Sequence, residues 1–289
     1  MMKRVVIVGT GLIGASVGLA LRAASFDGVI TGIDTKAEEL AAALKSGAID
    51  ESVTPGEQAL AACFEADVVV LAVPVLAIMH WADQLAPMLG PQTLVTDVGS
   101  TKFAICELAR KLFAGAGKAQ FLPGHPMAGK ESGGAALGDA TLFAGAIWLF
   151  TPLDEKMSEA VAEWRGWVTK MGARTMDLDA ARHDRICAWV SHLPQMVSTA
   201  MAAMFEDEFA EAPELAEEFR AIGGRALREM TRLGASPYSM WRDVALTNTK
   251  PIAATLFALE QRLAHVRENL KTPELREEFL KANEFRRER

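Results

Sequence analysis

Cysteine is scarce in this chain of 289 residues. Its three cysteines, Cys63, Cys106 and Cys187, are odd in number and far apart, and no CxxC pair or Cys/His ligand spacing accompanies them. We therefore expect neither a disulfide framework nor a zinc site, and we predict no metal ligand. The thiols are interpreted as small core residues of a reduced, cytoplasmic protein.

Excess positive charge and long apolar runs are also lacking. The formal net charge is −7 and the pI about 5.4, which disfavours non-specific binding to nucleic acid or to an anionic membrane. No apolar stretch is long enough to span a bilayer, and Val5–Val8 is too short for a signal peptide. We expect a soluble, cytoplasmic protein with no nucleic-acid or membrane partner.

The first part of the chain carries a nucleotide-binding pattern. The β-branched run Val5–Val8 predicts a buried strand, residues 12–24 predict a helix, and Val29–Ile33 predicts a second strand. The glycine-rich turn between the first strand and the helix fits a dinucleotide pyrophosphate, and Asp34 fits the ribose hydroxyls of NAD better than a 2′-phosphate. The alternative is a glycine-rich turn in an unrelated α/β protein. The expected cofactor contacts are Gly9, Gly11, Leu12, Ile13, Gly14, Asp34 and Pro74.

Strands and helices continue to alternate up to about residue 177. We predict strands over 66–73, 93–98, 120–122 and 146–150, and helices over 38–46, 76–88 and 101–113. Such alternation predicts a doubly wound, Rossmann-type α/β domain over residues 1–177. Gly9–Gly14, Pro74, Gly99-Ser100 and Gly124-His125 all follow predicted strands, so we expect them to line one rim of the sheet.

The remainder, residues 178–289, is predicted to be an all-helical domain. Asp177 or Asp179 can cap a long helix that reaches about Phe205 and bends at Pro194. Further helices are expected over 213–233, with a break at Gly223-Gly224, over 251–270, and from Glu274 to about Phe285.

Two groups of polar residues are candidates for chemistry. His125 stands between Gly124 and Pro126 in the glycine- and proline-rich stretch 121–133. Arg225, Arg228 and Arg232 are three and four residues apart and share a helix face, which suits either solvent or the carboxylates of a substrate.

Taken together, the chain resembles the prephenate/arogenate dehydrogenase family of tyrosine biosynthesis over nearly its whole length. The segments that carry the resemblance are Val-Gly-Thr-Gly-Leu-Ile-Gly (8–14), Thr-Asp-Val-Gly-Ser-Thr-Lys (96–102), Gly-His-Pro-Met-Ala-Gly-Lys-Glu-Ser-Gly (124–133), Ser-His-Leu-Pro (191–194), Met-Thr-Arg (230–232) and Met-Trp-Arg-Asp (240–243). The resemblance implies NAD-dependent oxidative decarboxylation of prephenate or arogenate, and a homodimer formed through the helical domain.

The resemblance also implies roles for individual residues. His125 matches the catalytic histidine and Ser100 the serine that orients it or the ring hydroxyl. The residues expected to bind substrate are Arg232, Arg228, His192, Glu131 and Trp241.

Each of these roles has a plainer alternative. Ser100 could cap the helix that starts near Thr101, while His192 and Trp241 could be core residues. Glu131 could pair with Lys130. Gln195 stands where many prephenate-type relatives have a second histidine, which leaves the choice between prephenate and arogenate open.

Two other classes of protein compete with this interpretation. The 3-hydroxyacid and 6-phosphogluconate dehydrogenases share the domain plan but have a catalytic lysine in a GxxGxGxxxK pattern, which does not occur between Asp177 and Phe205. A non-catalytic NAD sensor would keep Asp34 and the glycine-rich turn but would not need His125, Ser100 and an arginine face together.

Overall fold

A computed structural model describes residues 2–130, 132–154 and 157–287. A six-stranded parallel sheet forms the centre of the first domain, in the order β3-β2-β1-β4-β5-β6. The elements of this layer are β1 (Arg4–Val8), α1 (Leu12–Ala23), β2 (Val29–Ile33), α2 (Ala37–Ser46), β3 (Glu51–Val53), α3 (Glu57–Phe64), β4 (Val68–Leu71), α4 (Val75–Leu85), β5 (Leu94–Asp97), α5 (Phe103–Leu112) and β6 (Gln120–Leu122). The predicted Rossmann-type fold is confirmed.

Helices cover both faces of this sheet because side chains alternate along each strand. In β1, Val5 and Ile7 face the core formed with α1 and α6 (Glu159–Lys170), whereas Val6 and Val8 face the core formed with α3, α4 and α5. Nearly continuous apolar strands of this kind are expected where a parallel sheet is buried on both faces.

A second, smaller sheet corrects one expectation. The predicted strand at 146–150 is present as β8 (Ile147–Phe150), but it pairs with β7 (Gly124–Pro126) and β9 (Arg174–Asp177) instead of extending the main sheet. The sequence did not reveal β7 and β9, because β7 has only 3 residues and all residues of β9 are exposed.

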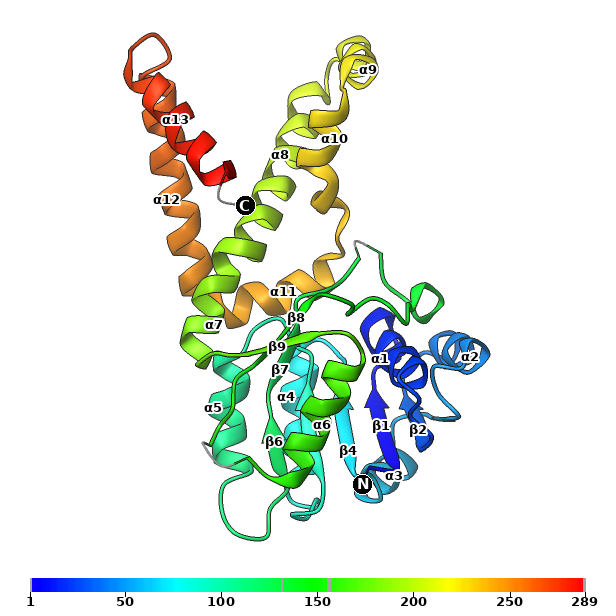
Figure 1. Ribbon diagram of the computed structural model, residues 1–289. Helices are drawn as coiled ribbons and strands as arrows, with labels where there is room; N and C mark the ends of the chain where they lie inside the picture. Colours follow the sequence, from blue (N-terminus) through cyan, green and yellow to red (C-terminus); the bar gives the residue numbers. More distant parts are fainter. Residues whose placement is uncertain (1, 131, 155–156, 288–289) are drawn as a thin grey trace.

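The helical domain rises as two arms above the first domain (Figure 1). One arm contains α7 (Ala180–Cys187), α8 (Leu193–Phe209), α9 (Pro213–Ile222) and α10 (Arg225–Thr231), and the other contains α12 (Thr249–Glu268) and α13 (Glu274–Arg287). The helix α11 (Tyr238–Thr247), which the sequence did not predict, lies across the base of the arms. None of the described helices combines the length and apolar character needed to cross a membrane.

The predicted bend at Pro194 has a specific form. Asp179 caps α7 by accepting the backbone N–H of Arg182, and a π-helical turn over Ala188–His192 then leads into α8, with Pro194 in its first turn. A π turn widens the helix locally, which accommodates a proline that cannot donate a backbone hydrogen bond.

The two domains are joined directly at the rim of the large sheet. Asp243 of α11 accepts the backbone N–H of Leu76 at 3.2 Å, and the hydroxyls of Thr101 and Thr247 are 2.7 Å apart. These bonds place the C-terminal helices over the carboxyl ends of the strands, where ligands bind in folds of this type.

Candidate active site

His125 lies in a strand rather than in an open loop. It is the central residue of β7, opposite Leu149 of β8, and only 8% of its surface is exposed. Gly124 allows this position, because a Cβ there would come within 2.9 Å of both the Asp97 carbonyl and Trp148 Nε1. The backbone of β7 therefore sets the position of His125 independently of its side-chain contacts.

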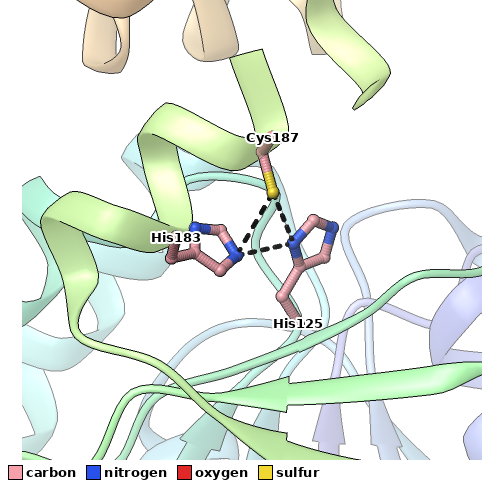
Figure 2. Close-up of side chains that lie close together, drawn as sticks. All are labelled: His125, His183 and Cys187. Atoms are coloured by element: carbon pink, nitrogen blue, oxygen red, sulfur yellow. Dashed lines mark hydrogen bonds between the residues drawn. The ribbon is translucent and has the colours of Figure 1, made fainter. Parts of the chain in front are cut away.

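Two residues that the sequence analysis missed contact the His125 ring. Nδ1 of His125 is 2.9 Å from Nε2 of His183, while Sγ of Cys187 is 3.6 Å from the same His183 nitrogen and 3.9 Å from His125 Nδ1. Figure 2 shows the three side chains converging from β7 and α7, with the second nitrogen of His125 pointing away from them. The spacing of His183 and Cys187, four residues apart on one helix face, was the signal available in the sequence.

The hydrogen bonds of Asp184 define the tautomer of both imidazoles. Its Oδ1 accepts the backbone N–H of Lys102 at 2.7 Å and lies 2.8 Å from His183 Nδ1, so this ring nitrogen is the donor. His183 Nε2 then carries a lone pair, and His125 must donate its Nδ1–H to it. Nε2 of His125 consequently carries a lone pair as well, directed away from the cluster.

Both rings are neutral at physiological pH. Burial lowers the pKa of His125 well below its usual value, helped by His183 and Lys102, and burial likewise lowers the pKa of His183 against the opposing hydrogen bond from Asp184. A neutral imidazole with an available nitrogen lone pair is a proton acceptor.

A buried ion pair holds the rim beneath this cluster. Lys102 and Asp97, neither of them exposed, form a salt bridge. Asp97 also accepts the backbone N–H groups of Gly99 at 2.9 Å and Gly124 at 3.2 Å, so one carboxylate links the end of β5 to the start of β7. Such a pair is weak evidence for net stability, but it fixes geometry.

Ser100 is half-buried at this rim, and it does not cap the following helix. The helix α5 begins at Phe103. The backbone N–H groups at its start, those of Lys102 and Phe103, donate to the Asp184 carboxylate. The hydroxyl of Ser100 makes no hydrogen bond with the described residues. The capping alternative is thus wrong, and the hydroxyl can interact with a ligand.

His192 and Trp241 form a second pair of polar groups under the helical domain. Their rings meet edge to face with centroids 5.8 Å apart. The side-chain amide of Asn248 donates to the Asp184 carbonyl and lies 3.1 Å from His192 Nδ1, so His192 accepts there and carries its proton on Nε2. Burial lowers the pKa of His192 to about 4.

Two buried N–H groups of this pair lack a partner. Nε2 of His192 and Nε1 of Trp241 are inaccessible and have no hydrogen-bond partner among the described residues. A buried donor without an acceptor costs roughly 1–3 kcal/mol. Nε1 of Trp148 and Nε1 of Trp164, in the core of the first domain, are in the same state.

The glycine-rich turn has the form that a dinucleotide needs. Gly9 has φ +92°, and a Cβ on Gly9 or Gly14 would clash with Ala72 or with the Gly9 carbonyl, respectively. A Cβ on Gly11 would meet nothing within 4 Å, and the N-terminus of α1, whose first residues are Leu12 and Ile13, has no side-chain cap and no acidic residue in its first turn. The free N–H groups suit a pyrophosphate.

Asp34 and Pro74 lie at the same edge of the sheet. Oδ2 of Asp34 accepts the backbone N–H of Thr10 at 2.8 Å and Oδ1 that of Lys36 at 3.0 Å, which fixes the carboxylate beside the turn. Pro74 is exposed and immediately precedes α4.

The arginines lie farther along the helical arm. Arg225 forms an exposed ion pair with Glu229, Arg228 is exposed on α10, and Arg232 begins a 3-10 turn over Arg232–Ala235. Gln195 anchors this turn to α8, because its side-chain amide donates to the Leu233 carbonyl at 2.7 Å. Glu131 lies outside the described residues.

The fold and the site define an NAD-binding oxidoreductase with a Rossmann-type domain and a helical second domain. Two family models match the chain: "Prephenate dehydrogenase, nucleotide-binding domain" over residues 17–177 and "Prephenate dehydrogenase, dimerization domain" over residues 179–283. The chain therefore belongs to the prephenate dehydrogenase family.

Individual relatives agree with this assignment. The chain is 34% identical to a prephenate dehydrogenase of Lactococcus lactis subsp. cremoris over 92% of its own length and 70% of the relative's. It is 31% identical to the prephenate dehydrogenase of Bacillus subtilis over 87% of its own length and 66% of the relative's. A crystal structure of prephenate dehydrogenase from A. aeolicus with hydroxyphenyl propionate and NAD+ superposes with a TM-score of 0.86 at 27% identity, covering 99% and 98% of the two chains. The crystal structure of Synechocystis arogenate dehydrogenase superposes with a TM-score of 0.77 at 28% identity, covering 99% of each chain.

Proposed function

We propose that this chain is a prephenate dehydrogenase, which oxidises the ring alcohol of prephenate with loss of carbon dioxide to give 4-hydroxyphenylpyruvate. In this proposal residues 1–177 bind NAD, and residues 178–289 cover the substrate and form the dimer. The observation that carries the proposal is the fixed tautomer of His125, which presents a nitrogen lone pair at the rim of the sheet.

His125 is assigned the role of general base. Its Nε2 accepts the proton of the ring hydroxyl, and Ser100, whose hydroxyl is not engaged by the described residues, orients that hydroxyl. When bound, NAD supplies the acceptor for the hydride. His183, whose Nδ1–H is held by the Asp184 carboxylate, accepts the Nδ1–H of His125 and so keeps Nε2 of His125 free to take the proton.

The carboxylates of the substrate are assigned to donors on the helical domain. The partnerless N–H groups of His192 and Trp241 suit one carboxylate. Arg232 suits the other because a guanidinium can bind both of its oxygens, and Arg228 adds positive charge on the same arm. From the family resemblance we also propose that Glu131 closes over the substrate side chain.

Asp34 leads us to propose NAD rather than NADP as the working cofactor. Its carboxylate is held beside the turn by Thr10 and Lys36, where it can accept the ribose hydroxyls and repel a 2′-phosphate.

Arogenate is the second candidate substrate, because an arogenate dehydrogenase shares the fold at a TM-score of 0.77 and a cyclohexadienyl dehydrogenase of Zymomonas mobilis is 29% identical over 88% of this chain. Steady-state NADH formation with prephenate and with arogenate separates the candidates, and NADP in place of NAD tests the cofactor. Turnover of neither substrate would refute the proposed function.

We further propose a homodimer formed through the two helical arms. Two large apolar residues of α12 are exposed in the single chain: Phe257 is 61% exposed and Leu263 is 58% exposed. A dimeric mass by light scattering at micromolar concentration would support this, whereas a monomeric mass would contradict it. The unpaired, buried thiols suit the reducing cytoplasm in which we expect the enzyme to work.

A further inference from the structure

The cluster of His125, His183 and Cys187 has a property that the proposed reaction does not use. We propose that it is a binding site for a zinc-type divalent cation, and that occupation of this site switches the enzyme off. The cation-binding part rests on geometry alone, whereas the loss of turnover rests on the proposed role of His125.

The three ligand atoms are already close to the required positions. They lie within 4.8 Å of one another, with 2.9 Å between the two nitrogens and 3.6 and 3.9 Å from the sulfur to them. A tetrahedral zinc ion with bonds of about 2.0 Å to nitrogen and 2.3 Å to sulfur requires separations of roughly 3.3 and 3.5 Å, respectively. Adjustments of a few tenths of an ångström therefore suffice.

The backbone holds these ligands in place. His183 and Cys187 lie one turn apart on α7, and His125 is fixed in β7 (Figure 2). The far nitrogen of His183 is hydrogen-bonded to Asp184 at 2.8 Å, which is the carboxylate–histidine arrangement that orients metal-binding imidazoles. The site has no local signature in the sequence, because His125 lies 58 residues from His183 in the chain.

The charges in the cluster also suit a divalent cation. The Cys187 thiolate and the Asp184 carboxylate together bring two negative charges, and the Lys102–Asp97 pair is neutral as a unit. Burial raises the pKa of Cys187 to about 12, so without metal the sulfur is a thiol, and binding releases this proton to solvent.

Binding would inactivate the base through its own tautomer. A metal ion on Nδ1 of His125 displaces the proton that this nitrogen donates to His183, and the ring stays neutral only if Nε2 takes up that proton. Nε2 then donates instead of accepting, so it cannot receive the proton of the ring hydroxyl. Turnover is lost while the NAD-binding turn, built from β1 and α1, is not affected.

Cys187→Ala tests the site without altering the proposed catalytic groups. Zinc should inhibit the parent enzyme, whereas the variant, measured against its own rate without zinc, should lose zinc inhibition. Loss of a metal ligand should weaken zinc binding, measured by calorimetry, by more than about 100-fold, since loss of an outer partner alone costs about 10- to 100-fold.

Cys63→Ala is the matched control. Cys63 is equally buried and its pKa is also raised to about 12, but it lies in the core between α3 and the sheet, and its substitution should leave zinc inhibition intact.

Cobalt provides a readout that does not depend on activity. Co²⁺ bound to the parent protein should give a thiolate-to-metal absorption band that Cys187→Ala lacks and Cys63→Ala retains. If the chain oxidises neither substrate, this band still tests the site. Absence of the band from the parent, equal zinc affinity of parent and Cys187→Ala, or zinc binding through Cys187 without inhibition would each overturn the proposal.

Discussion

Nε2 of His183 lies 2.9 Å from Nδ1 of His125, so the two buried imidazoles share one hydrogen bond with a single proton. Asp184 fixes the direction of that bond from the far side of His183. The proton-accepting face of His125 is thereby set by residues from the first helix of the other domain.

Replacement of His125 tests its role as base. His125→Asn should keep NAD affinity and lower kcat by about 10²- to 10⁴-fold, the usual contribution of general acid–base catalysis. Equilibrium NAD binding and steady-state kinetics measure the two quantities. Loss of NAD binding with unchanged residual chemistry would show that the role is misplaced.

His183 acts on His125 as a positioning residue. His183→Leu removes the acceptor of the Nδ1 proton and should lower kcat by about 10- to 100-fold, less than loss of the base itself. His183→Gln supplies an amide oxygen as acceptor and should recover part of that loss.

The pH profile separates this role from simple packing. His183 is one of the groups that lower the pKa of His125, so its removal raises that pKa. Because the base works only when neutral, the acidic limb of kcat/KM should move to higher pH in His183→Leu. An unmoved limb would mean that His183 only fills space.

Arg232 is expected to bind a substrate carboxylate. A charge-assisted pair contributes roughly 1.5–3 kcal/mol, so Arg232→Ala should raise the KM for substrate by about 10- to 100-fold without changing NAD affinity. Arg232→Lys should recover only part, since a point charge cannot bind both oxygens. Arg225→Ala, which removes an exposed residue paired with Glu229, is the control. Near-parent KM for Arg232→Ala would move the assignment to Arg228.

Three buried, neutral histidines make stability depend on pH. The pKa values of His125, His183 and His192 are all lowered in the folded state, that of His192 to about 4. Below about pH 6.5 the unfolded chain binds more protons than the folded one. The free energy of unfolding therefore decreases as the pH is lowered, by up to roughly 4 kcal/mol per pH unit for three such groups.

Urea unfolding at pH 7 and pH 5 measures this loss. The midpoint should be lower at pH 5, and the difference should be smaller in His192→Gln. His80→Gln, which changes an exposed histidine, should leave the difference unaltered. Equal midpoints at both pH values for the parent would contradict the prediction.

Local patterns in the sequence were sufficient for most of the fold. The strand Val29–Ile33 was predicted to the residue, and the helix stop at Gly47 is a left-handed residue with φ +75°. The exposed edge strand Glu51–Val53 was missed because it is short and has no buried face. The helix Glu159–Lys170 was missed although Ser158 caps it by accepting the N–H of Val161.

The candidate site was only partly accessible from sequence. The motif residues around His125 and Ser100 could be recognised because they are close together in the chain. The contact of His125 with His183 could not, because it joins positions 58 residues apart through the packing of α7 on the rim. The neighbouring acid Asp184 has two roles, as partner of His183 and as the cap of α5, and neither has a local signature.

The cap that Asp184 provides ties the two domains together at their boundary. The backbone N–H groups of Lys102 and Phe103 belong to the first domain, yet their acceptor is on α7. A hinge at the boundary near residue 178 would break these bonds and expose the start of α5. These two bonds fasten the start of α7 to the nucleotide domain, so that His183 stays in register with His125.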